Sequence, residues 1–458
     1  MAFTIIKNGR VLDPETGLDA VKDVVIVDSK ILEITDDINV EDYLHNNEMI
    51  GETEENDIVL DAEGCFVMPG LIDLHVHFRE PGFEEKETIR TGARAGIRGG
   101  FTSVCMMPNT KPVIDAPDTL AEVMDIAENT TTLQVHPIAA ITANQDGEYL
   151  TDFQTLYDNG AIAVSEDGKS VMNARVARQA MRLAAEIGVP VFAHCEDINL
   201  RARGVMNAGK RAKSLDLYGI LNEVEDIIVA RDIILAKDTG AQLHLCHCST
   251  KDSVELIRLA KEAGVNVTAE VTPHHLTLTE DDVDGTDANF KMNPPLRKKE
   301  DRDALIQGLK DGIIDCIATD HAPHTEEDKK LGFKQAPFGI VGLETAVPII
   351  YTEFVEKGIL TPLEMAEKMS YNPAKVIGVD RGRLQVGADG DVTIIDPNFE
   401  FEINPASFFS KGKNTPYAGK KVKGLVKATI IDGRVVYQNN GRNESIIETV
   451  EHLDEDYY

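Results

Sequence analysis

Basic residues are scarce in this chain, which has 46 lysines and arginines against 78 aspartates and glutamates among 458 residues. The formal net charge of −32 repels nucleic-acid backbones and anionic membranes, so neither is an expected partner. Much of the acidic excess falls in residues 41–55 and in the tail 444–458, which we interpret as solvated surface without an assigned function. The charge therefore bears on solubility and does not identify the chemistry.

Long apolar runs and paired cysteines are also missing. The chain has no tract of ~20 apolar residues, the length that a membrane span needs. Residues 1–7 lack the basic start and apolar block of a secretion signal. The six cysteines show no CxxC spacing, which is typical of reduced thiols in a cytosolic enzyme. We therefore expect a cytoplasmic protein without disulfides. We expect no cysteine-ligated metal, because strand alternation places His247 opposite Cys246 and Cys248.

Short β-forming runs occur near both ends of the chain, at 3–6, 24–27 and 58–60 and again at 391–396, 426–431 and 434–437. The two ends are expected to pair into one small β-domain. Residues 1–65 would form its first part, and residues 379–458 its second part together with the acidic tail.

Between these ends, apolar strand candidates alternate with amphipathic helix candidates such as 173–187, 220–238 and 253–263. The eight strand candidates are 71–77, 101–107, 133–141, 161–165, 189–193, 242–246, 265–271 and 314–319. This rhythm predicts an α/β fold, a distorted (β/α)8 TIM-type barrel over residues 66–378. A doubly wound open sheet is the alternative, although no GxGxxG turn follows any strand.

The first barrel strand is expected within the apolar run 66–72, which we interpret as one buried strand, and it closes with Asp73-Leu74-His75-Val76-His77. Alternation along a strand places Asp73, His75 and His77 on one face. Two imidazoles one pleat apart can bind one metal ion. For an isolated His-x-His pair, hydrogen-bonded core histidines are an equally good interpretation.

The ends of the other strands favour a site. In a barrel of this type, chemistry gathers at the carboxyl ends of the strands. Four of these ends hold six of the twelve histidines. The set that suits a borderline cation such as Zn²⁺ is His75, His77, His194, His247, Asp167 and Asp320. Six ligands exceed the needs of one catalytic ion, so we expect two ions, ~3.5–4 Å apart, that share a bridging carboxylate and a hydroxide.

Other residues at the same rim suggest roles in proton transfer and in substrate binding. Asp320 could take the proton of a metal-bound water and pass it to a leaving nitrogen. Arg79 and Asn109 suggest an anionic, amide-bearing substrate. The alternative for Arg79 is a surface ion pair with Glu80, Glu84 or Glu85. Asn293 could bind an imide or ureido group, or it could simply form a turn. We interpret residues 274–275 as histidines of a loop or of the layer behind the metal ligands.

At this point the chain resembles the type I dihydroorotases of the amidohydrolase superfamily over nearly its whole length. The phrases that carry the resemblance are His75-Val76-His77-Phe78-Arg79-Glu80-Pro81-Gly82, Met107-Pro108-Asn109-Thr110, Glu166-Asp167-Gly168, Ala193-His194-Cys195-Glu196, Leu245-Cys246-His247-Cys248-Ser249-Thr250, Thr272-Pro273-His274-His275-Leu276, Asn293-Pro294-Pro295-Leu296, Ala318-Thr319-Asp320-His321-Ala322-Pro323-His324 and Pro337-Phe338-Gly339-Ile340-Val341-Gly342-Leu343-Glu344-Thr345.

The resemblance implies a reaction and a role for each residue. The reaction is the reversible cyclisation of N-carbamoyl-L-aspartate to dihydroorotate in pyrimidine biosynthesis. One zinc ion would be held by His75, His77 and Asp320, and the other by His194 and His247, with Asp167 as the bridge. The substrate carboxylate would be bound by Arg79, Asn109 and His324, and the ring by Asn293.

The end of the fourth strand distinguishes this chain from related amidohydrolases. Hydantoinase-like and allantoinase-like relatives carry a carboxylated lysine at the end of the fourth strand, where this chain reads Val164-Ser165-Glu166-Asp167 and has no lysine before Lys169. Glu166 remains an alternative to Asp167 as the bridge.

A related cyclic-ureide hydrolase is the alternative function. A non-catalytic barrel that partners a carbamoyltransferase would be expected to have lost ligands, and all six remain here. A homodimer and an association with a carbamoyltransferase also stay open.

Overall fold

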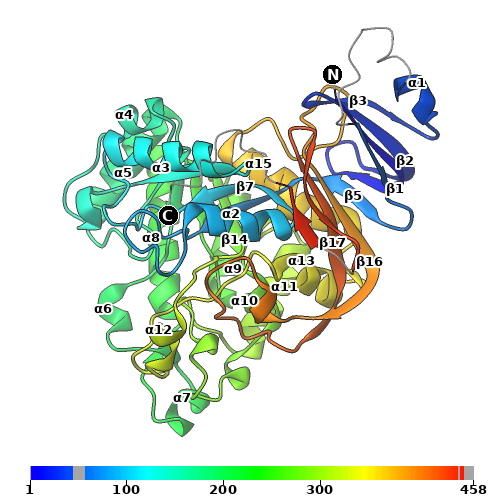
Figure 1. Ribbon diagram of the computed structural model, residues 1–458. Coiled ribbons are helices and arrows are strands. Elements are labelled where there is room, and N and C mark those ends of the chain that lie inside the picture. The colour runs from blue at the N-terminus through cyan, green and yellow to red at the C-terminus, as the bar shows by residue number, and fades with distance from the viewer. Residues whose placement is uncertain (1, 45–56, 442–443, 448–458) are drawn as a thin grey trace.

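The computed structural model describes residues 2–44, 57–441 and 444–447 (Figure 1). Most of both acidic stretches, 41–55 and 444–458, lies outside the described residues. Among the described helices, none is long and apolar enough to cross a membrane.

A parallel eight-stranded barrel forms the centre of the molecule, and its strands follow chain order without exception. The strands are β6 (Leu71–Val76), β7 (Phe101–Met106), β8 (Gln134–Ala140), β9 (Ala163–Ser165), β10 (Val191–Ala193), β13 (Leu243–Leu245), β14 (Val267–Val271) and β15 (Cys316–Ile317). All eight predicted strands are confirmed, and the open-sheet alternative is wrong. The first and last strands meet, since His77 N donates to His321 O at 2.8 Å and Thr319 N donates to Asp73 Oδ1 at 3.0 Å.

Helices surround the barrel, and their ends follow from local sequence. Helix α5 starts where Asn173 accepts a hydrogen bond from Arg175 N, and it ends at Gly188, whose φ of 86° is the left-handed conformation that glycine adopts freely. The predicted helices 173–187, 220–238 and 253–263 are confirmed as α5, α8 and α9. The helices are α1 (Val40–Leu44), α2 (Ile89–Arg98), α3 (Pro117–Thr130), α4 (Phe153–Asp158), α5 (Ala174–Ile187), α6 (Ile198–Arg201), α7 (Lys210–Ser214), α8 (Glu223–Thr239), α9 (Lys251–Glu262), α10 (Pro273–Thr277), α11 (Lys299–Lys310), α12 (Glu326–Lys330), α13 (Ala346–Ile350), α14 (Pro362–Ala366) and α15 (Asn372–Ile377).

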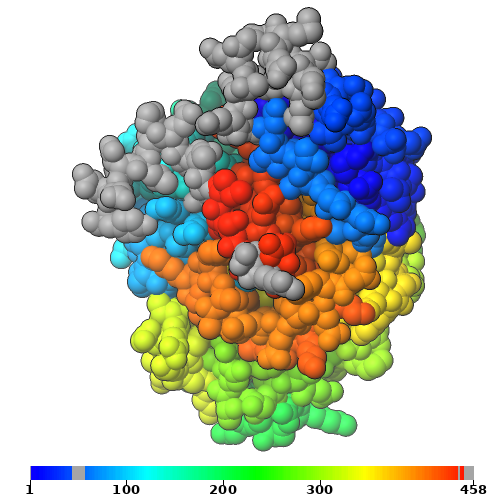
Figure 2. Space-filling view, turned by 45° about the vertical axis from the view of Figure 1, so that its right-hand side comes forward, coloured from blue at the N-terminus to red at the C-terminus, as the bar shows by residue number. Residues whose placement is uncertain are grey.

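A second sheet joins the two ends of the chain, as the sequence predicts. Its strand order is β19-β18-β17-β16-β5-β1-β2-β3, with β4 beside β1. In Figure 2 the blue amino-terminal and the orange to red carboxyl-terminal segments lie side by side on one face. The strands are β1 (Phe3–Asp13), β2 (Leu18–Val27), β3 (Lys30–Thr35), β4 (Ile58–Asp61), β5 (Phe66–Pro69), β16 (Val392–Glu402), β17 (Lys421–Ile431), β18 (Arg434–Asn439) and β19 (Glu444–Ile446). The short strands β11 (Met206–Asn207) and β12 (Gly219–Ile220) pair with each other.

The apolar run 66–72 is two strands, so the prediction of a single strand is wrong. Strand β5 pairs with β1 and β16 in the terminal sheet, and β6 begins the barrel only two residues after β5 ends. The change of sheet occurs at Gly70, where an added Cβ would lie 2.3 Å from Thr102 Oγ1. Glycine is therefore required at this corner, and the barrel strand that carries His75 is covalently continuous with the terminal sheet.

Apolar side chains fill the barrel interior and close its amino-terminal end. Ile72, Leu74 and Ile138 belong to a buried cluster that also contains Ala374, Val376 and Ile377 from the region of α15. Strict alternation fails on β6, because its register against β7 shifts between Asp73 and Val76. Asp73 therefore bonds to Thr319 at the barrel seam and does not share the face of His75 and His77.

Candidate metal centre and active-site cavity

A cavity of about 300 Å³ opens at the carboxyl ends of the barrel strands. Nine of the ten predicted site residues line it, namely His77, Arg79, Asn109, Asp167, His194, His247, Asn293, Asp320 and His324. The tenth, His75, is fully buried and lies within 3.3 Å of Asp167. The structure therefore brings together residues that the sequence spreads over some 250 positions.

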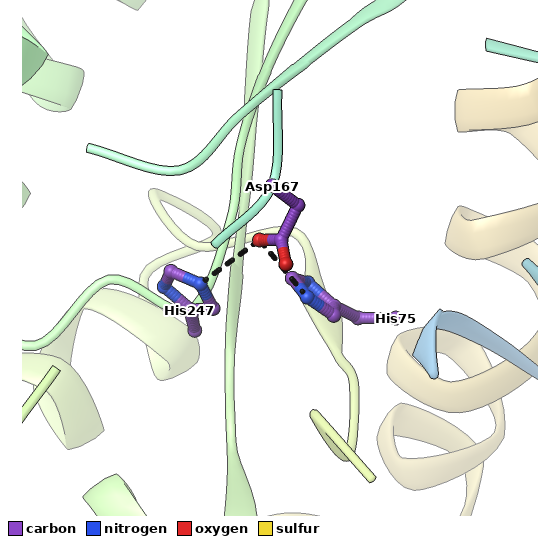
Figure 3. A group of neighbouring side chains, drawn as sticks. All are labelled: His75, Asp167 and His247. Carbon is purple, nitrogen blue, oxygen red and sulfur yellow. Dashed lines mark ion pairs between the residues drawn. The ribbon is translucent and has the colours of Figure 1, made fainter. Parts of the chain in front are cut away.

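Asp167 occupies the middle of the donor cluster (Figure 3). Its Oδ1 lies 3.3 Å from His75 Nε2, 3.4 Å from His194 Nδ1 and 3.7 Å from His247 Nε2. Its Oδ2 lies 3.6 Å from His77 Nε2. The two oxygens of this carboxylate thus face different imidazole groups, which is the arrangement that a bridging ligand requires.

Asp320 stands on the other side of the cluster. Its Oδ1 lies 3.1 Å from His77 Nε2 and 3.7 Å from His75 Nε2. Three overlapping groups of possible ligand atoms lie within 4.8 Å of one another: His75 with Asp167 and His247, His75 with His77 and Asp320, and His75 with Cys246 and Glu270. His194 approaches the first group, because its Nδ1 lies 3.0 Å from His247 Nε2.

Two acceptors fix which ring nitrogen of each histidine faces the cluster. Glu270 Oε1 lies 2.9 Å from His75 Nδ1, and Asn109 Oδ1 lies 3.0 Å from His77 Nδ1. An acceptor at Nδ1 requires that this nitrogen carries the hydrogen, so Nε2 presents its lone pair to the cluster. Glu270 also lies 3.1 Å from His244 Nε2 and accepts from His247 N at 3.2 Å.

These donors fit a cation. Neither His75 Nε2 nor Asp167 Oδ1 has a hydrogen-bond partner among the described residues, although both are buried. Two lone pairs that face each other need a positive charge between them. In the absence of a metal ion, a proton on His75 supplies this positive charge. Burial alone would lower the pKa of His75, but the neighbouring Asp167 carboxylate raises this pKa well above its usual range. The nitrogen and oxygen donors suit Zn²⁺ or a similar ion.

The backbone is strained where the site residues leave their strands. Arg79, His247 and Asp320 have φ angles of 65°, 33° and 49°, in the left-handed region that non-glycine residues rarely adopt. All three line the cavity. Such strain persists only where surrounding contacts hold the residue in place, and it is typical of functional sites.

Glu166 and Lys169 point elsewhere. The Glu166 carboxylate accepts hydrogen bonds from the backbone N–H and the hydroxyl of Thr142. Lys169 donates to Gln145 O at 2.9 Å. Among the described residues, Asp167 is therefore the only carboxylate at the end of the fourth barrel strand that reaches the donor cluster.

Arg79 brings a positive charge without a partner to the cavity. Among the described residues, no carboxylate oxygen lies within 4.0 Å of its guanidinium, which donates only to Pro323 O at 3.4 Å. Glu80 and Glu84 accept instead from the backbone N–H groups of Ile89 and Gly82. Burial lowers the pKa of Arg79 to about 10, so the side chain stays charged at neutral pH. The alternative of an ion pair with these glutamates is therefore wrong.

His324 and Asn293 complete the predicted set. His324 Nε2 donates to Phe338 O at 2.8 Å, and burial together with Arg79 lowers the pKa of His324 to about 2, so the ring is neutral. Asn293 Nδ2 donates to Glu196 Oε1 at 3.1 Å. The Asn293 amide oxygen is therefore the part of this side chain that can accept a bond from a ligand.

Sequence reasoning missed several residues of the site. Glu270 was hidden within a strand prediction, and its partner His75 lies 195 positions away. Glu196 and Arg201, which line the cavity, form an ion pair of 3.0 Å. A charged residue inside an apolar strand, as in Val267-Thr268-Ala269-Glu270-Val271, was the one available signal. His274 and His275 are buried in α10 and do not line the cavity.

Comparisons with known proteins agree with this site. A family model described as dihydro-orotase-like matches residues 64–253. The chain is 50% identical to the dihydroorotase of Pelotomaculum thermopropionicum over 435 residues, 95% of this chain and 98% of the relative. The chain belongs to the dihydroorotase family. Another member, the dihydroorotase of Anoxybacillus flavithermus, is 48% identical over 96% of this chain and 100% of the relative.

Solved structures of other amidohydrolases share the architecture of this family member. The L-hydantoinase (dihydropyrimidinase) of Arthrobacter aurescens superposes with a TM-score of 0.84 at 26% identity and 98% coverage of both chains. The dihydropyrimidinase of Brevibacillus agri superposes with a TM-score of 0.80 at 24% identity and 95% coverage of both chains, a likeness of fold alone. The dihydroorotases are about twice as similar in sequence as these two structures.

Proposed function

We propose that the protein is a zinc-dependent dihydroorotase, which catalyses the reversible cyclisation of N-carbamoyl-L-aspartate to dihydroorotate in pyrimidine biosynthesis. The observation that carries the proposal is the unpaired Arg79 guanidinium in the cavity that also holds the donor cluster. An unpaired, partly buried cation is costly unless an anion joins it. N-carbamoyl-L-aspartate and dihydroorotate both carry a carboxylate that can pair with this guanidinium. Relatives at 46–51% identity bear the name dihydroorotase.

The proposed metal ligands are the six donors described above. His75, His77 and Asp320 would hold one Zn²⁺ ion, His194 and His247 the other, and Asp167 would bridge the two. When bound, such a pair of ions lowers the pKa of water in the cavity and polarises the substrate carbonyl.

The residues of the chain supply the proton transfer and the binding. In the hydrolytic direction, the Asp320 carboxylate takes a proton from the attacking water and gives it to the ring nitrogen that leaves. In the cyclising direction, Asp320 takes the proton of the carbamoyl nitrogen as this atom attacks the carboxylate carbon, and passes it to the departing oxygen, which leaves as water with a second proton taken from solvent.

Arg79 would hold the substrate carboxylate that does not react, with two parallel N–H···O bonds. Asn109 would donate from Nδ2, because its Oδ1 already accepts from His77. His324 would join them by exchanging the Phe338 carbonyl for a carboxylate oxygen. The Asn293 amide oxygen, which is free of the Glu196 contact, would accept from a ring N–H.

The test is zinc content combined with steady-state kinetics on the purified protein. We expect about two zinc ions per chain and turnover of dihydroorotate that a chelator removes and added zinc restores. Absence of turnover in a zinc-loaded sample would refute the proposal. The competing function, hydrolysis of a neutral cyclic ureide, follows from the likeness to hydantoinases. A higher kcat/KM for hydantoin, allantoin or dihydrouracil than for dihydroorotate would establish it and would contradict the role of Arg79.

Location and assembly remain proposals from the sequence. We expect a cytoplasmic enzyme, and both a homodimer and an association with a carbamoyltransferase stay open. Sedimentation of the protein alone and mixed with a carbamoyltransferase of the same organism distinguishes these states.

A further inference from the structure

A second cavity, of about 550 Å³, adjoins the active-site cavity. It lies between residues 286–289, helix α12 and the segment 411–414. His324 lines both cavities and therefore lies at the boundary between them. Nothing in the proposed mechanism uses the second cavity.

The second cavity is positively charged although the chain as a whole carries a net charge of −32. Its charged lining consists of Lys329, Lys330, Lys411 and Lys413 against Asp287 and Glu326. Among the described residues, only Lys330 of these four lysines has a carboxylate oxygen within 4.0 Å, that of Glu326 at 2.8 Å. The ammonium groups of Lys329, Lys411 and Lys413 donate to backbone carbonyl oxygens, at distances of 2.6–3.4 Å. Carbonyl groups satisfy the hydrogens of an ammonium group but leave its charge uncompensated.

Other cations stand close to this lining. Burial, the neighbouring Lys291 and Arg79 together lower the pKa of Lys329 to about 7. Lys291 itself donates to Lys334 O and Ala336 O, and its ammonium lies 4.7 Å from the centre of the Phe338 ring. The positive charge thus runs from the second cavity to Arg79 in the first. An anion in either cavity relieves this mutual repulsion.

We propose that this lysine-lined cavity is a collecting site for small dicarboxylates, from which the substrate passes His324 into the active-site cavity. The inference rests on the proposed function, in which one reactant, N-carbamoyl-L-aspartate, is a dianion. The negative charge of the whole molecule repels such a reactant, and a local group of uncompensated cations raises its concentration beside the site. A volume of 550 Å³ is sufficient for a molecule of this size.

The kinetic test removes or reverses one charge of the cavity and compares it with a matched lysine elsewhere. Lys411 donates to one backbone carbonyl at 2.8 Å, and so does Lys427 in the terminal sheet, to Asp61 O. At low ionic strength, Lys411→Glu is expected to lower kcat/KM for N-carbamoyl-L-aspartate about tenfold, and Lys411→Gln about threefold. At about 0.5 M salt these differences should disappear. Equal losses for Lys427→Glu and Lys411→Glu, or losses that persist in salt, would overturn the inference.

A second measurement does not depend on catalysis or on a variant. Acetylation of lysines in the unaltered protein is followed by mass spectrometry with and without succinate as the dicarboxylate probe. We expect succinate to protect Lys411 and Lys413 at low salt and to leave Lys427 unprotected. Equal protection at all three lysines, or at none, would overturn the collecting site. Absence of dihydroorotate turnover in the unaltered enzyme would instead overturn the proposed function, so the two failures are distinguishable.

Discussion

The two ends of the barrel are built in opposite ways. At the carboxyl end, His75, Asp167 and Asp320 are buried together, and Asp320 has a strained backbone. At the amino end, apolar side chains close the interior, and the neighbouring polar groups are paired: Ser370 Oγ donates to Gly70 O, and Asn372 Nδ2 donates to Asp315 O.

This contrast separates the parts of the molecule that perform chemistry from the parts that stabilise it. Buried charges and left-handed backbone at one end cost stability, and dense apolar packing at the other end offsets this cost. Mutations at the two ends should therefore affect different measurements.

Asp320 and Asp315 flank the same short strand, β15, and give the sharpest comparison. Asp320→Ala should lower kcat by about 10³-fold or more because the proton acceptor is lost, with little change in Tm. Asp315 accepts from Ala269 N at 2.8 Å and pairs with Lys261 at 2.7 Å. Asp315→Ala should therefore lower Tm and leave kcat within about twofold of the unaltered protein. Near-normal turnover of Asp320→Ala would refute the proton-transfer role.

Ile138 tests the packed interior. It is fully buried on β8, a strand that provides no proposed metal ligand. Ile138→Ala should reduce the free energy of unfolding by about 2–5 kcal/mol, measured in urea, with kcat per folded molecule retained. Ile234 on α8 is 66% exposed, so Ile234→Ala should change the same quantity by less than about 0.5 kcal/mol. Similar losses for both variants would mean that the interior is not the source of stability.

Arg79 tests the anion-binding side of the rim. Arg79→Met should lower kcat/KM for dihydroorotate about 10²-fold, mainly through KM, because the variant loses a charged two-pronged contact. Arg178→Met is the matched control, since Arg178 is half-exposed and pairs with Asp238 at 2.7 Å on the surface. A loss confined to kcat would contradict carboxylate binding by Arg79.

Glu270 tests the layer behind the ligands. Glu270→Gln keeps the shape but removes the charge that orients His75, so zinc affinity should fall about 10- to 100-fold in a chelator competition assay. Glu225 is a comparable buried carboxylate that accepts from Ser249 N at 2.9 Å. Unlike Glu270, Glu225 belongs to none of the three groups of possible ligands. Glu225→Gln should leave zinc affinity unchanged. Equal effects of the two variants would show a general loss of structure.

Sequence patterns predicted the regular parts of the molecule well and its local irregularities poorly. The eight strands were found because each is a short apolar run followed by a polar strand end. The change of sheet at Gly70 was missed because the apolar run continues through it, and only the close approach of Thr102 reveals the corner. Alternation misplaced Asp73 because a register shift interrupts β6.

The site shows the same division. The six proposed ligands lie at strand ends, so topology alone predicts their meeting. Glu270 lies within a strand, and its contacts depend on which way one side chain points. The lysine-lined cavity joins residues near 288, 329 and 411, which no local pattern connects.

Strand β5 has a consequence for how the chain is made. It pairs with β1 on one side and with β16 on the other, and β16 begins more than 300 residues after β5 ends. During translation, the edge of β5 that pairs with β16 therefore stays unpaired until the whole barrel has been synthesised. Strands β16 to β19, which complete the sheet from which the His75 strand starts, follow all eight barrel strands in the chain.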